Sequence, residues 1–179
     1  MHERVEHHLG ERVLLDEELH TVTEVARTRW GSPTYRASTA EGASRWLTPR
    51  AVETPASYVD AASIERFVRA FYGRVQQDPV LAPIFASRIV AWEPHLARMV
   101  HFWSAILLAA PGFMGNPMQK HRELSGVAPE DFERWLALFE ATLLEVYEPG
   151  VAEAVLTRAR RIAARLSAAM FSEPARVCG

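Results

Sequence analysis

A histidine follows a proline turn in the segment MGNPMQKHREL, residues 114–124. This residue, His121, could fill space, titrate near neutral pH or bind a metal. A second histidine, His95, comes four residues before Met99 and seven before Phe102, which places it on the apolar face of a predicted helix. A histidine on such a face is more often a core residue with satisfied hydrogen bonds than a ligand. His95 taken alone therefore leaves both interpretations open.

Two polar aromatic side chains add to these histidines. Tyr72 lies at the edge of one apolar helical stripe and Trp135 lies on another. Each could present a hydrogen-bond donor to an apolar interior, where an unpaired donor is costly. Packing with the polar tips turned to backbone carbonyls explains either residue equally well. His101 is six residues from His95 and projects about 120° away around the helix. A two-histidine metal site is therefore not expected there, and His101 is predicted to lie at the surface or in a second layer around the site.

Four helices must position these side chains, because apolar residues recur with the 3.6-residue period. The sequence predicts helices over about 61–77, with Asp60 as the N-cap, and over 92–109. A third opens at VAPEDF, and Gly150 separates it from a fourth. His121 falls in the Gly- and Pro-rich segment between the second and third helices, in at most one or two turns. No segment alternates like a half-buried strand, so the predicted fold class is all-α.

The N-terminal third shows a much weaker pattern. The stretch LLDEELHTVTEVARTRW could form a short helix, although its apolar stripe is thin. The sequence that follows is rich in Ser, Thr, Ala, Pro and Gly and predicts a linker or disorder. We therefore predict a poorly ordered extension over 1–58, a helical domain over 59–172 and a tail over 173–179. The extension could be a disordered tail, a partner-binding arm or an overlong reading frame.

Composition limits the classes of partner. The 179 residues carry a formal net charge of −2, so no nucleic acid partner is expected. The histidines at 2, 7, 8 and 20 are predicted to be solvated rather than to form a metal site, since no carboxylate or cysteine spacing accompanies them. The arginines at 27, 29, 36, 45 and 50 follow no helical face, which argues against an arm that binds an anionic surface.

The sequence also limits the cellular compartment in which the protein is expected. The first 13 residues are charged and lack the apolar run of a secretory signal, and the one cysteine, Cys178, cannot build a disulfide framework. Both features favour a cytoplasmic protein. The most apolar run, residues 99–114, is interrupted by His101 and Pro111 and is shorter than the roughly 20 residues of a membrane span. No membrane span is expected.

Five motifs in order give the chain a family likeness: FYGRVQQDPVLAPIF, WEPHLARMVHFWSAILL, GNPMQKH, FERWLALFEATL and RARRIAARL. Over about residues 60–171 the sequence resembles a truncated hemoglobin of the third group, and it lacks the Gly-Gly pairs of the other two groups. The resemblance implies a globin-like two-over-two helical sandwich that holds iron in heme b. No Cys-x-x-Cys-His is present, so the heme is expected to be bound non-covalently.

The resemblance assigns roles to individual positions. His121 matches the proximal histidine that ligates iron, and His95 matches the distal histidine. Tyr72 and Trp135 match the distal tyrosine and tryptophan that hydrogen-bond the ligand or enclose it. The porphyrin contacts that it implies are Phe71, Phe85, Met99, Phe102 and Trp103, with Arg98 as a partner for a heme propionate. We expect the second ring nitrogen of His121 to donate to the carbonyl of Pro117, which would fix the tautomer.

Three functions follow as hypotheses. The leading one is a heme protein of the oxygen-carrier type that binds dioxygen or another diatomic gas, such as nitric oxide or carbon monoxide. The second is a heme enzyme that consumes peroxide or oxidises nitric oxide, which would need an external reductase because this sequence offers no flavin or nicotinamide module. The third is a heme-free helical domain whose N-terminal arm contacts a partner. Binding is expected rather than catalysis.

Overall fold

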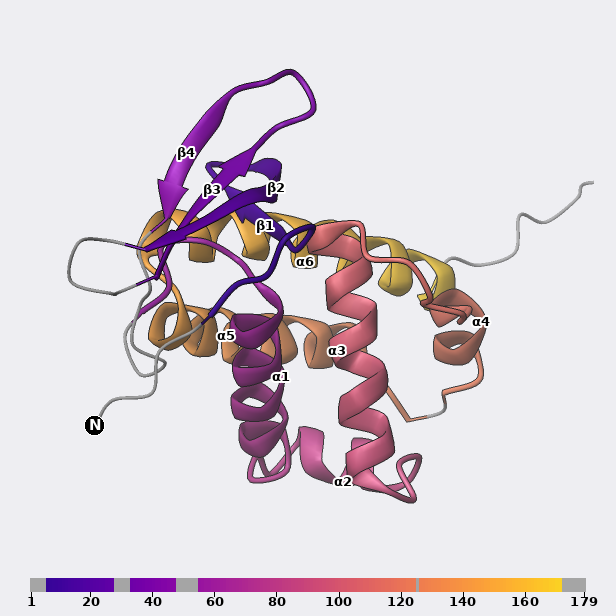
Figure 1. The fold of residues 1–179 in the computed structure, drawn as a ribbon. Coiled ribbons are helices and arrows are strands. Elements are labelled where there is room, and N and C mark those ends of the chain that lie inside the picture. The colour runs from indigo at the N-terminus through magenta and orange to yellow at the C-terminus, as the bar shows by residue number, and fades with distance from the viewer. Residues whose placement is uncertain (1–5, 28–32, 48–54, 125, 172–179) are drawn as a thin grey trace, which may run out of the picture.

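The computed structural model describes residues 6–27, 33–47, 55–124 and 126–171. Within them the chain forms a four-stranded antiparallel sheet and then a helical domain (Figure 1). The strands are β1 (Arg12–Leu15), β2 (Glu18–Arg27), β3 (Pro33–Ser38) and β4 (Ser44–Leu47), and the helices are α1 (Ala61–Val75), α2 (Leu81–Ala86), α3 (Trp92–Leu108), α4 (Pro117–Arg122), α5 (Pro129–Val146) and α6 (Pro149–Phe171). His2, Cys178 and the predicted tail over 173–179 lie outside the described residues.

Helix α1 begins at the N-cap that the sequence predicts. The Asp60 carboxylate accepts the Ser63 N–H at 2.6 Å, and the Ser63 hydroxyl accepts the Asp60 N–H at 2.9 Å. This reciprocal pair is a capping box, which satisfies two backbone donors at once. The predicted cap is confirmed. Helix α3 ends as expected within a residue, and Ala109 follows it in a left-handed conformation with φ of 48°.

The boundary between the last two helices differs from the prediction. Gly150 lies in the first turn of α6 instead of separating the two helices. The chain breaks at Tyr147, which is extended, and the Glu148 N–H donates to the Ala56 carbonyl at 3.0 Å. The helical run therefore ends where the backbone of Glu148 bonds to the segment before α1, and not at a glycine.

Aromatic side chains fill the centre of the helical domain. Helix α1 packs against α3 and α5, α5 packs against α6, and the short α4 packs against α6. Phe139 of α5 is completely buried, and its ring centroid lies 4.6 Å from that of Phe67, 5.2 Å from that of Phe71 and 5.1 Å from that of Trp103. These contacts pack α1, α3 and α5 together around the Phe139 ring. No helix in the described part of the chain is long and apolar enough to cross a membrane.

The N-terminal region is a folded sheet, so the predicted poorly ordered extension is wrong and the predicted all-α class holds for the helical domain only. Strands β1 and β2 are joined by Asp16 and Glu17, which both have positive φ, 46° and 68°. A two-residue turn with two positive φ values suits the twist of a hairpin, but it is usually made by Asn-Gly or Gly-Gly. The pair Asp-Glu carries no such signal, and the helix predicted across it is replaced by two strands.

The sheet encloses a small second core. Its buried apolar residues are Val13, Leu15, Val22, Tyr35, Ala37 and Leu47, together with Tyr58 from the segment that leads into α1. The alternation that would predict these strands is masked in β2, where the pairing register shifts between Val22 and Glu24. It is masked further by His20, a polar residue that is only 4% exposed. The sheet thus lacks the regular period that identifies a strand.

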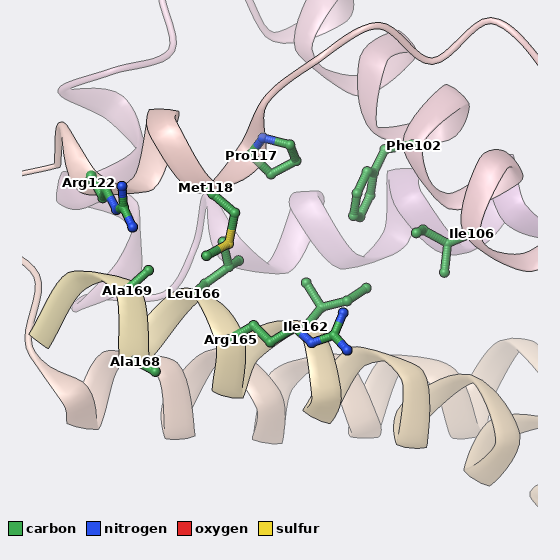
Figure 2. A pocket seen from close by; sticks show the side chains of 10 residues that line it. All are labelled: Phe102, Ile106, Pro117, Met118, Arg122, Ile162, Arg165, Leu166, Ala168 and Ala169. Atoms are coloured by element: carbon green, nitrogen blue, oxygen red, sulfur yellow. The ribbon is translucent and has the colours of Figure 1, made fainter. Parts of the chain in front are cut away.

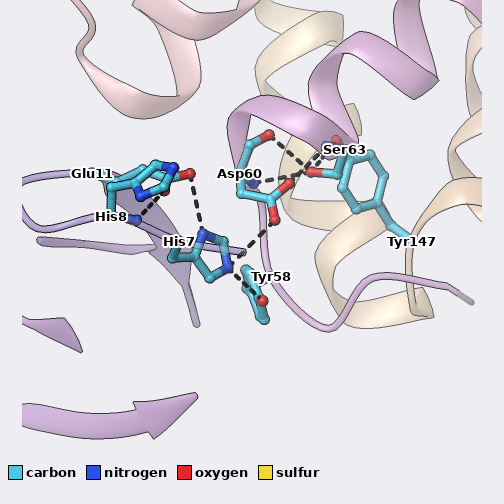
Figure 3. A network of polar contacts seen from close by, with 7 residues as sticks. All are labelled: His7, His8, Glu11, Tyr58, Asp60, Ser63 and Tyr147. Atoms are coloured by element: carbon cyan, nitrogen blue, oxygen red, sulfur yellow. Dashed lines mark hydrogen bonds and ion pairs between the residues drawn. The ribbon is translucent and has the colours of Figure 1, made fainter. Parts of the chain in front are cut away.

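Two of the histidines predicted to be solvated are buried. His7 is 2% exposed and lies where the sheet meets α1 (Figure 3). Its Nδ1 is 3.1 Å from a Glu11 carboxylate oxygen, and its Nε2 is 2.8 Å from the Tyr58 hydroxyl and 3.7 Å from the Asp60 carboxylate. The prediction failed for His7 because two of its three partners, Tyr58 and Asp60, lie more than 50 residues away in the sequence, which spacing does not reveal. It also failed for His20, which lies in β2 and is 4% exposed.

Candidate functional site

Helices α1 and α3 bring Tyr72 and His95 together. The two rings meet edge-on, with centroids 5.0 Å apart and planes at 87°. Trp92, three residues before His95 on α3, also meets the His95 ring edge-on at 5.9 Å and contacts Tyr72 at 6.3 Å. The His95 imidazole therefore lies between two aromatic rings, and its orientation is restricted by both.

The surroundings of His95 make it a neutral imidazole. Burial, with a smaller contribution from the positive charge of Arg98, lowers the pKa of His95 to about 4. Its Nε2 atom is buried and has no hydrogen-bond partner among the described residues. Leaving such an atom unpaired costs about 1–3 kcal/mol. A cost of that size in a buried cluster indicates a place where a bound molecule completes the hydrogen bonding.

Tyr72 is a buried hydrogen-bond donor next to this imidazole. Its side chain is 5% exposed, and burial raises the pKa of the phenol. The hydroxyl therefore stays protonated at physiological pH. Tyr72 thus offers its hydroxyl as a donor, and His95 offers its Nε2 atom, which has no partner among the described residues, in the same region.

Helix α5 contributes Trp135 to the edge of the cluster. Its ring stacks on Phe139 at 4.7 Å and meets Phe71 edge-on at 5.2 Å. Phe71 in turn contacts Tyr72 at 5.0 Å. Phe71 thus links Trp135 to the Tyr72 and His95 pair, and three residues from three helices occupy neighbouring positions.

His121 is held by its own short helix. Asn116 caps α4 by accepting the Gln119 N–H at 3.1 Å, and Pro117 occupies the first turn, where its missing N–H costs nothing. The half-buried His121 lies 2.7 Å through Nδ1 from the Pro117 carbonyl oxygen. Because a carbonyl only accepts, Nδ1 donates and carries the proton. The hydrogen bond that the sequence predicts is present, and it leaves the lone pair on Nε2.

A cavity of about 890 Å³ lies between α3, α4 and α6 (Figure 2). This volume is within the range of about 300–1,000 Å³ that cofactor sites occupy. The lining residues are Phe102, Ile106, Pro117, Met118, Arg122, Ile162, Arg165, Leu166, Ala168 and Ala169. Two of them, Arg122 and Arg165, are cationic and make no ion pair or hydrogen bond with another described residue. The rest form an apolar wall.

The other residues that the sequence singled out lie at different depths in the fold. Phe102 lines the cavity, whereas Phe71 and Trp103 are buried in the core. Phe85 and Met99 are half-buried and pack against that core. Arg98 and His101 are exposed, as predicted for His101. Arg98 does not line the cavity.

Sequence reasoning missed several residues of this region. Trp92 had a usable signal, since a residue three positions before His95 shares its helix face. On α6, Ile162, Leu166 and Ala169 follow the spacing of one face, but nothing in the sequence says that this face borders a cavity instead of filling the core. The two arginines of the cavity carry no distinguishing pattern.

Comparison with known proteins decides the family. Residues 59–170 match the model of the bacterial-like globin family. The chain belongs to this family, in the third group of truncated hemoglobins. The resemblance inferred from the five motifs is confirmed, and the helical domain is globin-like.

A sequence comparison and a structure comparison give the extent of the match. The group 3 truncated hemoglobin ctb of Campylobacter jejuni is 33% identical over 117 residues, which span 63% of this chain and 92% of that protein. The crystal structure of the group III truncated hemoglobin from Campylobacter jejuni matches at a TM-score of 0.64 with 32% identity, and the match covers 66% of this chain and 97% of that one. The strands of this globin lie before the segment that the family model matches.

The residues present fit the heme that the family implies. The Nε2 atom of His121 retains a lone pair for iron, and the buried Nε2 of His95 has no hydrogen-bond partner in the part of the chain that the structure describes. The cavity combines an apolar wall with two uncompensated arginines. Heme is flat and apolar and carries two carboxylates, so the size and the charge of this lining both suit it. His121 and His95 are not themselves lining residues, and the cavity is connected to His121 through its α4 neighbours Pro117, Met118 and Arg122.

Proposed function

We propose that this globin binds heme b non-covalently, with His121 as the protein ligand of the iron, and that it binds dioxygen or another diatomic gas. Heme iron, when bound, supplies the coordination position for the gas. The proposal rests above all on the 2.7 Å contact of His121 Nδ1 with the Pro117 carbonyl. This contact fixes the tautomer, makes the ring more basic and leaves Nε2 to coordinate.

The residues around His95 would receive the gas. A bound diatomic that gains partial negative charge is stabilised by N–H and O–H donors in an apolar surrounding. Tyr72 offers a hydroxyl that stays protonated, and Trp135 offers an indole N–H. The neutral His95 can donate through Nε2 in one tautomer. Such donors act chiefly by slowing the release of the ligand.

We propose a more specific function. The gas is dioxygen, and the protein holds it as an oxygen carrier in the cytoplasm, while a separate reductase keeps the iron ferrous.

We also propose the limits and the arrangement of the globin domain. The domain extends over 59–172, and its helix pairs, α1 with α3 and α5 with α6, form the two-over-two sandwich. Support comes from the packing of α1 on α3 and of α5 on α6.

The heme propionates would pair with Arg122 and Arg165. Both line the cavity, and neither has a partner among the described residues, whereas Arg98, the partner expected from the sequence, lies outside it. A guanidinium and a carboxylate form a strong charge-assisted hydrogen bond when both are available. Arg98 has a different influence, because its charge lowers the pKa of His95.

Spectroscopy with one substitution tests the proposed function. The purified full chain should take up heme with a Soret band and bind carbon monoxide in the ferrous state. His121→Ala should lose the five-coordinate spectrum and regain it on addition of imidazole, while His101→Ala, a change at an exposed histidine of α3, should behave as the parent chain does. A parent chain without a Soret band would favour the heme-free interaction domain. A His121→Ala chain with an unaltered spectrum would show that His121 is not the ligand of the iron.

A further inference from the structure

Strand β1 of the N-terminal sheet touches the end of helix α3. The guanidinium of Arg12 donates to the Leu108 carbonyl at 3.3 Å and to the Ala109 carbonyl at 3.0 Å. Carbonyls at a helix C-terminus have no partner inside the helix, and a positive charge is favourable there. Arg12 therefore supplies both the donor and the charge that the end of α3 requires.

The same strand also holds the start of helix α1. The Leu14 N–H donates to the Val59 carbonyl at 2.9 Å, and the Val59 N–H donates back to Leu14 at 3.0 Å. The Leu14 side chain is 5% exposed and belongs to the core of the globin domain. Val59 immediately precedes Asp60, the N-cap of α1. A carboxylate oxygen of Asp60 also lies 3.7 Å from the His7 Nε2 atom (Figure 3). Strand β1 thus joins one end of α1 to one end of α3 (Figure 1).

The end of α3 is also where the chain departs toward His121. Ala109 has a φ of 48°, a conformation that a residue with a Cβ adopts only at some cost. The connector from Ala109 to Asn116 then leads to α4, and its Phe113 ring contacts Phe102 of α3 at 5.2 Å. Because α4 packs on α6 and makes no comparable contact with α3, the connector is the direct link between α3 and α4, and it acts together with α6 on the position of His121.

We propose that Arg12 is a positioning residue for His121, through which the N-terminal sheet fixes the connector between α3 and α4. Arg12 holds the Leu108 and Ala109 carbonyls, the held carbonyls fix the direction in which the connector leaves α3, and the connector places α4. The sheet then supports the segment that carries His121, the proposed ligand of the heme iron. The link to His121 rests on the proposed function, whereas the anchoring of the connector does not.

Hydrogen exchange of the full chain before heme addition tests the anchoring. Arg12→Gln removes the charge, Arg12→Lys keeps it, and Arg36→Gln is the control because Arg36 pairs with Glu24 at 3.5 Å on the same sheet. The amides of Ala109 and Ala110, which both donate to the Ser104 carbonyl, should exchange about 10-fold faster in Arg12→Gln, at the parent rate in Arg36→Gln and at an intermediate rate in Arg12→Lys. Circular dichroism should be equal in all four proteins. Equal exchange in Arg12→Gln and Arg36→Gln would overturn the proposal.

The heme-loaded proteins test the effect on His121. The iron–histidine stretching band should shift in Arg12→Gln, and heme transfer to an acceptor globin should be about 3- to 10-fold faster than in the parent and the Arg36→Gln control. A parent chain that takes up no heme would refute the proposed function. If the parent binds heme but the band and the transfer rate are the same in Arg12→Gln, the proposed function stands and the positioning role of Arg12 is wrong.

Discussion

The imidazole of His95 stands perpendicular to the phenol of Tyr72, with ring centroids 5.0 Å apart and planes at 87°. The two residues lie 23 positions apart in sequence and on different helices. The contact covers part of the His95 ring without giving its buried Nε2 a hydrogen bond among the described residues. It therefore disfavours the imidazolium and keeps the ring neutral, which gives a measurable pH dependence.

Stability should fall when the pH is lowered through the range in which His95 resists protonation. The unfolded chain binds this proton near pH 6.5 and the folded chain only near pH 4. Between these values the unfolded state holds more protons, so stability rises with pH there and falls on acidification. We expect His95 to contribute a loss of about 1–2 kcal/mol, below the full value of the shift because the ring is still partly solvated. Urea unfolding at pH 7 and at pH 4.5 measures it.

The control for this pH effect is a side chain that does not titrate. His95→Gln should show a smaller loss of stability between the two pH values than the parent chain does. Arg98→Gln should raise the pKa of His95, measured by NMR, because it removes the neighbouring positive charge. Equal losses in the parent and in His95→Gln would mean that His95 titrates normally in the folded state.

Removing a donor beside His95 should speed the release of oxygen. Tyr72→Phe deletes only the buried hydroxyl, and Trp135→Phe deletes the indole N–H while it keeps an aromatic ring on Phe139. A hydrogen bond to a partly charged ligand contributes about 1–3 kcal/mol, so we expect dissociation to be about 5- to 100-fold faster in each variant. Stopped-flow replacement of oxygen by carbon monoxide measures the rate. Trp46→Phe, at a half-exposed position of the sheet, is the matched control.

The arginines of the cavity should retain heme. Arg122→Gln with Arg165→Gln removes both cations that line the cavity, and heme transfer to an acceptor globin should become about 10-fold faster. Arg98→Gln should leave this rate near that of the parent chain, since Arg98 does not line the cavity. Were Arg98→Gln to accelerate heme loss more than the double variant, the propionate partners assigned here would be wrong.

The globin domain could be predicted from the sequence because its helices follow a regular period. Phe67, Phe71 and Phe139 recur on helical stripes and meet in the core. The turn residue Pro117 both starts α4 and accepts from His121, so local spacing was sufficient for that hydrogen bond. Relations within one helix or one turn are encoded by spacing alone.

The sheet and the cavity could not be predicted in the same way. The β1–β2 turn uses Asp16 and Glu17 at positive φ, where a glycine or asparagine would have signalled a hairpin. His7 is buried against Glu11 and Asp60, and the second of these partners is 53 residues away. The face of α6 that borders the cavity looks like any core stripe. Each of these features depends on long-range packing.

An ion pair between the α1–α2 turn and α5 should weaken in acid. Both oxygens of the Asp78 carboxylate share the Nε–H of Arg134, at 2.8 and 2.9 Å, and one of them also accepts the Val80 and Leu81 N–H groups at the start of α2. The hydrogen bond from Arg134 is the main cause that lowers the pKa of Asp78 to about 2. The stabilisation is present above the unfolded pKa near 4 and is lost as the pH falls toward 2.

Two substitutions separate the ion pair from the turn. Asp78→Asn keeps an oxygen for the Val80 and Leu81 N–H groups but loses the charge, whereas Asp78→Ala loses both. We expect Asp78→Ala to lower the free energy of unfolding at pH 7 by about 1–2 kcal/mol and Asp78→Asn by less than half as much. Glu140→Gln, which removes an exposed pair with Arg160, is the control and should have little effect. Urea unfolding decides the order, and an Asp78→Asn chain as unstable as Asp78→Ala would place the whole effect in the ion pair with Arg134.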